Sequence, residues 1–189
     1  MKRRMKRSAP RAQQPRRATG RAGADSVDLE GRTDATFGPP TFRTHHERLS
    51  RGTGCDACPP NECVHMTGML RTNYTTSTVV TLPTVDPGLA RCQRERVQRA
   101  IRTVLAPHEQ QHVRAFNTYS GVTNRPFQLT TCRTDIEAER DTLTQQMVNE
   151  EDADRQDKAR EKSATLDPFV AHVDLDCTDT PQRRGTRRP

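Results

Sequence analysis

The sequence predicts an α+β fold, in which a short antiparallel sheet packs on one helix and a second long helix, between disordered basic tails. Apolar and β-branched residues occur in short runs over residues 64–83, an apolar period typical of a helix covers residues 97–119, and residues 134–163 form a long charged stretch. Only 31% of the residues are hydrophobic, 29% are charged and none is tryptophan, so we do not expect a core along the whole chain.

The ends of the chain are basic and lack apolar periodicity. Residues 1–21 contain nine Lys or Arg and no acid. We expect disorder over residues 1–51, a folded domain over 52–178 and a second basic tail over 179–189. Such a tail could contact nucleic acid or an anionic surface weakly.

The domain begins with strands and continues with a helix. Residues 64–83 predict two or three strands, interrupted at Gly68 and ending at Pro83. The helical face that follows contains Val97, Ile101, Val104, Leu105, His108, His112, Ala115, Phe116 and Tyr119. Pro107 should kink this helix or restart it.

The remaining elements are less apolar. Residues 122–132 predict a loop or an edge strand, and residues 134–163 a charged helix with Ile136, Leu143 and Met147 as a thin buried stripe. Residues 166–177 close the domain as a turn and a strand.

The five residues from His108 to His112 read HEQQH. On a helix, two histidines four residues apart lie on one face, where their imidazoles can share a metal ion. Glu109 follows the first histidine and would act as the base that takes a proton from a metal-bound water. The pattern therefore predicts a zinc site and a peptidase that hydrolyses peptide bonds in a peptide or protein substrate.

A catalytic zinc site needs a third protein ligand. A metzincin would have Gly and His where this chain has Ala115 and Thr118, which excludes that class. An acid on the following helix, Glu137 or Glu139, is one option. Asp167 and His172, in the apolar segment near the end of the domain, are the others.

The order of these motifs resembles a known family. HEQQH after an LP-containing strand segment, then a long charged helix and D-x4-H, is similar to the bacterial predicted zinc-dependent proteases called domain of unknown function 922. The resemblance covers about Cys63 to Cys177 and implies a zincin-like domain. It favours His172 as the third ligand, with Asp167 either orienting His172 or binding zinc itself.

Tyr119 lies on the same helical face, seven residues after His112. Its hydroxyl could stabilise an oxyanion, although packing is the more common role of such a tyrosine.

Six cysteines in so polar a domain predict disulfides, for which six residues allow fifteen pairings. Cys92 with Cys132 and Cys63 with Cys177 are the pairs that we expect, with Cys55 bonded to Cys58 or left over. The alternative is a zinc knuckle of Cys55, Cys58, Cys63 and His65, which with the basic tail would bind nucleic acid.

Disulfides also favour a location outside the cytoplasm. No conventional signal peptide or membrane-spanning segment is visible, so we expect secretion by a non-conventional route. A catalytically degenerate zincin, acting as a delivered effector or structural component, is the alternative to an active peptidase. The sequence does not indicate an oligomeric state.

Overall fold

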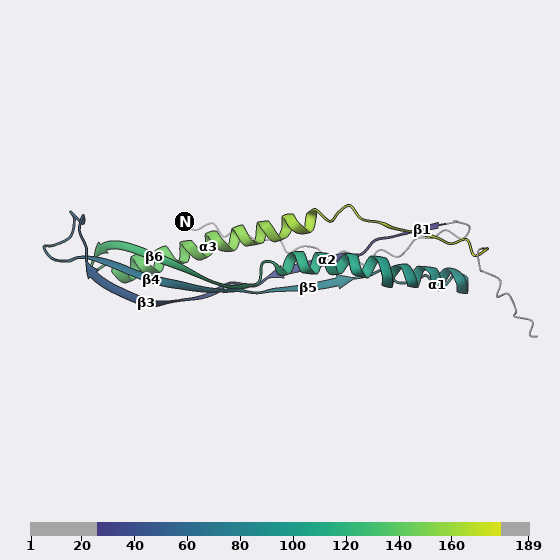
Figure 1. Cartoon of the computed structure of the whole chain (residues 1–189), viewed down its shortest axis with the longest axis horizontal. Coiled ribbons are helices and arrows are strands. Elements are labelled where there is room, and N and C mark those ends of the chain that lie inside the picture. Colours follow the sequence, from purple (N-terminus) through teal and green to yellow (C-terminus); the bar gives the residue numbers. More distant parts are fainter. Residues whose placement is uncertain (1–25, 179–189) are drawn as a thin grey trace, which may run out of the picture. The chain divides into compact units, whose positions relative to one another are not determined.

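The computed structural model describes residues 26–178 (Figure 1). Contacts within the chain divide these residues into two compact units. The first unit contains the described residues up to Arg32, Thr81–Pro107 and those from Phe169 onward. The second unit contains Thr33–Val80 and His108–Pro168. Each unit has its own buried apolar cluster, so each is described by itself.

The first unit combines a two-stranded sheet with a helix. Strand β1 (Ser26–Leu29) pairs antiparallel with β7 (Ala171–Asp174). Helix α1 (Arg91–Ala100) continues into η1 (Ile101–Leu105), a π-helical turn. The buried core consists of Val27, Leu29, Val97, Leu105, Ala171, Val173 and Leu175.

The second unit contains a three-stranded antiparallel sheet in the order β3 (Thr41–Arg51), β4 (Cys63–Tyr74) and β6 (Gly121–Cys132). The long helix α3 (Ile136–Ala164) runs beside these strands (Figure 1). Along β4, buried and more exposed residues alternate, so one face of the sheet packs against α3. The core at this contact consists of Val64, Met66, Leu70, Phe127, Ile136 and Val148.

A second sheet and a helix complete this part of the molecule. Strand β2 (Arg32–Phe37) pairs with β5 (Thr76–Thr81), and α2 (Ala106–Asn117) precedes β6. Phe37, Tyr74, Tyr119 and Ala159 form the local apolar cluster. Within the described residues, no helix is both long enough and apolar enough to cross a membrane.

The predicted α+β class is confirmed, with antiparallel sheets, a helical segment from Arg91 to Asn117 and a second long helix. The irregularity predicted at Pro107 is also present, because a π-helical turn ends two residues before it and the Ala106 N–H bonds to the Ile101 carbonyl. Proline cannot donate the next helical hydrogen bond, and a π turn is one way for a helix to accommodate such a gap.

Disorder over residues 1–51 is wrong for residues 26–51, which form β1, β2 and β3. Almost every β3 residue is exposed, so the strand is maintained by its backbone hydrogen bonds to β4. An apolar period in the sequence does not predict such a strand. Residues 1–25, with most of the predicted basic tail, and residues 179–189 lie outside the described part of the chain.

The predicted disulfides form, but with different partners. The bonds join Cys55 to Cys63, Cys58 to Cys132 and Cys92 to Cys177. The expected pairs Cys92–Cys132 and Cys63–Cys177 are therefore wrong. Cys92 and Cys177 lie in the first unit and the other four cysteines in the second, where β4 and β6 align Cys63 with Cys132. Three disulfides favour an oxidising, extracytoplasmic environment.

Candidate metal centre

Three side chains that can bind a metal ion meet in the second unit. His108 and His112 lie one helical turn apart on α2, and their Nε2 atoms are 3.1 Å apart. An Asp167 carboxylate oxygen, Oδ1, lies 3.7 Å from His108 Nε2 and 3.5 Å from His112 Nε2. The three residues form the only such group of at least three His, Cys, Asp or Glu side chains within the described residues.

Asp167 reaches the histidines because the chain turns directly after α3. The helix ends at Ala164, and two backbone hydrogen bonds then form tight turns, from Leu166 N–H to the Ser163 carbonyl and from Asp167 N–H to the Ala164 carbonyl. These bonds place Asp167 at the C-terminal end of α3, beside the α2 face that carries both histidines.

The spacing of the three donor atoms suits a small divalent cation. A tetrahedral ion with bonds of about 2.0–2.1 Å holds its ligand atoms about 3.3–3.4 Å apart. The three separations of 3.1, 3.5 and 3.7 Å surround this value. With an ion bound, both neutral Nε2 atoms would donate electron pairs to it.

The centre is enclosed on one side and open on the other. His108 and His112 are 8% and 6% exposed, whereas the Asp167 side chain is 58% exposed. A structural zinc site is usually closed by four protein ligands, while a catalytic site keeps one position for water. Three protein ligands with one exposed edge match the second arrangement.

Ser163 fixes the orientation of one imidazole. The His112 Nδ1 atom lies 2.7 Å from the Ser163 hydroxyl oxygen, and both residues are buried. An N–H at Nδ1 that donates to this oxygen leaves the Nε2 lone pair of His112 directed at the centre. In this tautomer, Ser163 would hold His112 with its Nε2 atom ready to bind a metal ion.

Glu109 is held by a residue from a distant part of the sequence. Its side chain is buried, and the Thr33 hydroxyl donates a 2.7 Å hydrogen bond to carboxylate atom Oε2. Thr33 belongs to β2, 76 positions earlier in the chain. This bond occupies one carboxylate oxygen and leaves Oε1 to accept a proton.

Of the predicted third ligands, the structure groups Asp167 with the two histidines. His172, which the prediction favoured, is on β7 in the first unit, where its Nδ1 atom pairs with Asp28 Oδ1 at 2.6 Å. Glu137 and Glu139 are in the first turn of α3. At about 1.5 Å per residue, they lie roughly 35–40 Å from Ser163 along the same helix, too far to bind the metal.

Tyr119 packs in the core and does not face the centre as an oxyanion stabiliser would. It is fully buried, and its hydroxyl donates to Asp152 Oδ1 at 2.6 Å, with the Gly38 carbonyl 3.1 Å away. Burial, reinforced by the bond to Asp152, raises the pKa of Tyr119 well above the usual phenol value. Burial and the nearby Glu151 charge raise the pKa of Tyr74 to about 12.

The predicted zinc knuckle does not form. Cys55, Cys58 and Cys63 are all in disulfides, so none offers the thiolate that zinc needs. The fourth member, His65, lies on β4 with Nδ1 2.8 Å from the Thr130 hydroxyl.

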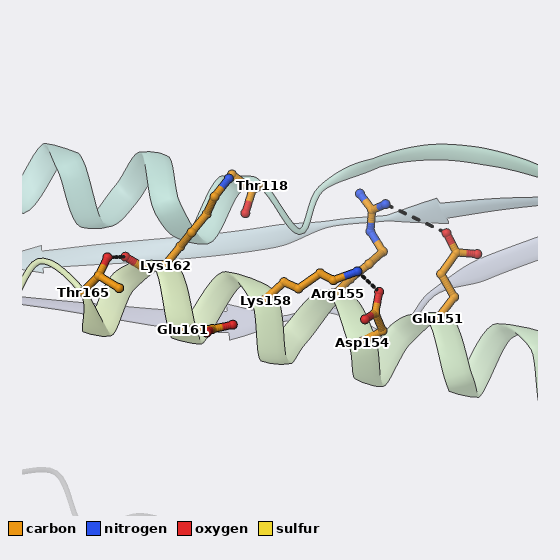
Figure 2. Close-up of a pocket in the computed structure, with 8 residues that line it drawn as sticks. All are labelled: Thr118, Glu151, Asp154, Arg155, Lys158, Glu161, Lys162 and Thr165. Atoms are coloured by element: carbon orange, nitrogen blue, oxygen red, sulfur yellow. Dashed lines mark hydrogen bonds and ion pairs between the residues drawn. The ribbon is translucent and has the colours of Figure 1, made fainter.

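A hollow of about 540 Å³ runs along α3 from Glu151 to Thr165, with Thr118 on its other wall (Figure 2). Its acids and bases largely neutralise one another: Lys158 pairs with Asp154 at 2.7 Å, and Arg155 lies 3.9 Å from Glu151. Two further lining residues, Lys162 and Thr165, flank Ser163 in sequence. The hollow thus extends toward the part of α3 that contacts His112.

Two residues of the centre, Thr33 and Ser163, are not apparent from the sequence. Thr33 lies in a segment whose composition predicts disorder, and Ser163 is a single hydroxyl at the end of a charged helix. Only the HEQQH pattern itself gives a local signal. Comparison of the chain with protein-family models, with curated proteins and with solved structures finds no match.

Proposed function

We propose that the chain is a zinc-dependent peptidase. The observation that carries the proposal is the meeting of His108, His112 and Asp167 within ligand distance of one another, with the buried carboxylate of Glu109 next to the first histidine in sequence. This combination supplies three zinc ligands and a base, as the hydrolysis of a peptide bond requires.

Each residue then has one role. His108, His112 and Asp167 hold the metal, and Ser163 maintains the His112 tautomer. Bound zinc would supply a water of lowered pKa and would polarise the carbonyl under attack. Glu109 takes the proton of the attacking water and returns it to the leaving amine. Thr33 keeps the Glu109 carboxylate in one orientation.

The donor set favours zinc over the hard cations. Two imidazole nitrogens and one carboxylate oxygen suit zinc, whereas calcium and magnesium prefer all-oxygen sites with six or more ligands. The exposed side of Asp167 leaves room for water and for a peptide carbonyl. The hollow along α3 offers adjacent surface for the rest of the peptide, and its balanced charge predicts no strong preference for charged substrates.

The setting of this activity is extracytoplasmic. We propose a secreted zincin-like peptidase, in agreement with the family that the motif order resembles. The disulfides support an oxidising destination.

Metal analysis together with a peptide digest tests the proposal. Purified protein should contain about one zinc per chain and should cleave a mixed peptide library. Glu109→Gln should retain the zinc and lose cleavage, by roughly a thousandfold or more. Glu137→Gln is the matched control, because this acid lies at the far end of α3.

Two results would contradict the proposal in different ways. Zinc that binds to the wild type without any cleavage would indicate a degenerate zincin with a structural or effector role. A chain without zinc affinity, or cleavage unchanged in Glu109→Gln, would reject the site or its mechanism.

A further inference from the structure

The face of the β3–β4–β6 sheet that points away from α3 carries an unusual set of side chains. We call it the open face: it contains alternate residues of β4 from His65 to Asn73 and the residues paired with them on β3 and β6. All of these residues are exposed or half-buried, in contrast to the buried residues between them. No described element covers it in the way that α3 covers the opposite face.

The open face is basic. It carries Arg43, Arg48 and Arg71 together with His45, His65 and, at the bulge of β3, His46. The chain has 24 acidic residues, yet none of the described residues on this face is acidic. Glu47, which lies in the same bulge, instead pairs with Arg140 of α3, on the covered side.

Most other arginines of the second unit have a carboxylate partner, and the arginines of the open face do not. Arg125, Arg133, Arg140, Arg155 and Arg160 each have a carboxylate within 4.0 Å. Among the described residues, Arg43, Arg48 and Arg71 have no such partner. Their guanidinium groups therefore remain available to an anion from outside the chain.

The pairing of β3 with β4 places two of the three arginine side chains next to each other. Arg43 and Arg71 are directly paired across β3 and β4, which brings two like charges side by side at some cost in stability. Further along β3, Arg48 and His46 border a hollow of about 600 Å³ that also includes Thr67 and Gln128. An anionic chain laid across the strands would meet charge and hydrogen-bond donors at both places.

We propose that the open face binds an anionic polysaccharide, with the three arginines contacting its sulfate or carboxylate groups. The paired residues of the face include no Phe, Tyr or Trp, the large aromatic side chains on which nucleic-acid bases stack best, which disfavours single-stranded DNA or RNA. The disulfides favour an oxidising environment outside the cytoplasm, where such polysaccharides occur. The proposed peptidase would thereby be held on a polyanionic matrix, whether or not it is catalytically active.

The test measures binding of the full chain to a heparin oligosaccharide at several salt concentrations. The variant R43Q/R48Q/R71Q should bind about tenfold to a hundredfold more weakly, and its salt dependence should become shallower. The matched control R91Q/R99Q/R102Q removes three exposed arginines from the first unit and the same charge. It should lose less than about threefold. Circular dichroism checks that both variants fold.

Three results would overturn the proposal. The first is an equal loss in the two triple variants, which would mean that net charge alone drives binding. The second is tighter binding to an oligo-dT of equal charge, or to phosphatidylserine vesicles, than to heparin. The third is no binding of the wild type. If R43Q/R48Q/R71Q fails to fold, R48Q and R71Q as single variants should each show a partial loss, and unchanged binding in both would equally reject the proposal.

Discussion

The Thr33 hydroxyl donates to Glu109 Oε2 across 2.7 Å and so connects strand β2 with the proposed catalytic helix. The hydrogen-bond partner of Thr33 is thus the proposed base, Glu109, which is not one of the three metal-binding side chains. The contribution of Thr33 to the proposed reaction should therefore be separable from metal binding.

Thr33→Val removes this hydrogen bond and nearly preserves the shape of the side chain. We expect zinc content to be unchanged and kcat for peptide cleavage to fall roughly tenfold to a hundredfold, because Glu109 loses the contact that orients it. Thr36→Val, at an exposed position of the same strand, is the control and should leave kcat unaltered. Equal kcat values for the two variants would show that the contact does not matter for catalysis.

The third ligand can be identified by comparing Asp167→Ala with His172→Ala. Asp167 Oδ1 lies within 3.7 Å of both imidazoles, so its loss should weaken zinc affinity by at least about tenfold. His172 contacts Asp28 instead, and its loss should leave affinity unchanged. Competition with a chromophoric chelator measures both values. Loss of zinc from His172→Ala alone would contradict the arrangement described here.

The outcome for these residues shows which features a sequence can predict. The helical period and the i, i+4 histidine spacing are local, and both were correct. The third ligand depends on where the turn after α3 places Asp167, and the sequence contains several acids and a histidine that could take this role. Thr33 lies in a strand of alternating exposure whose polar composition resembles that of a disordered tail. In both cases, contacts between segments that are far apart in the sequence decide the outcome.

Dependence on long-range contacts also explains why the disulfide pairing was predicted wrongly. The number of cysteines and the polar composition were enough to predict that the cysteines form disulfides. The pairing could not be predicted, because Cys58 finds Cys132 only after β4 and β6 have aligned. The fold also places Cys92 and Cys177 in one unit and the other four cysteines in the other, which the sequence does not reveal.

Disulfide mapping and unfolding should reveal this pairing. A non-reducing digest should release Cys58 linked to Cys132 and Cys92 linked to Cys177. Peptides that join Cys63 to Cys177 would contradict it.

Removal of the Cys58–Cys132 bond by a double serine substitution should destabilise the protein more than removal of Cys55–Cys63. The bonds close separations of 74 and 8 residues, so the entropic difference is about 2 kcal/mol in favour of the longer loop. Urea unfolding followed by circular dichroism measures the difference. Equal losses would mean that the shorter bond contributes through native-state contacts and not through the entropy of the unfolded chain.

The two tyrosines of the chain provide a pH-dependent signal for the second unit. Both are buried, and the pKa of Tyr74 is raised to about 12 and that of Tyr119 higher still. In the unfolded chain both phenols would ionise near pH 10. Because the folded state retains these protons longer, stability should be constant up to about pH 10 and should fall as the pH rises toward 12.

Absorbance at 295 nm, recorded together with circular dichroism, measures this coupling. Phenolate should appear only as the helical signal is lost, in one transition above the usual phenol range, and the absence of tryptophan leaves the signal undisturbed. Tyr119→Phe should halve the phenolate amplitude and, because it removes the phenol with the more strongly raised pKa, should make the fall of stability between pH 10 and 12 shallower. Ionisation of both tyrosines near pH 10 with an intact helical signal would show that these side chains are not buried as described.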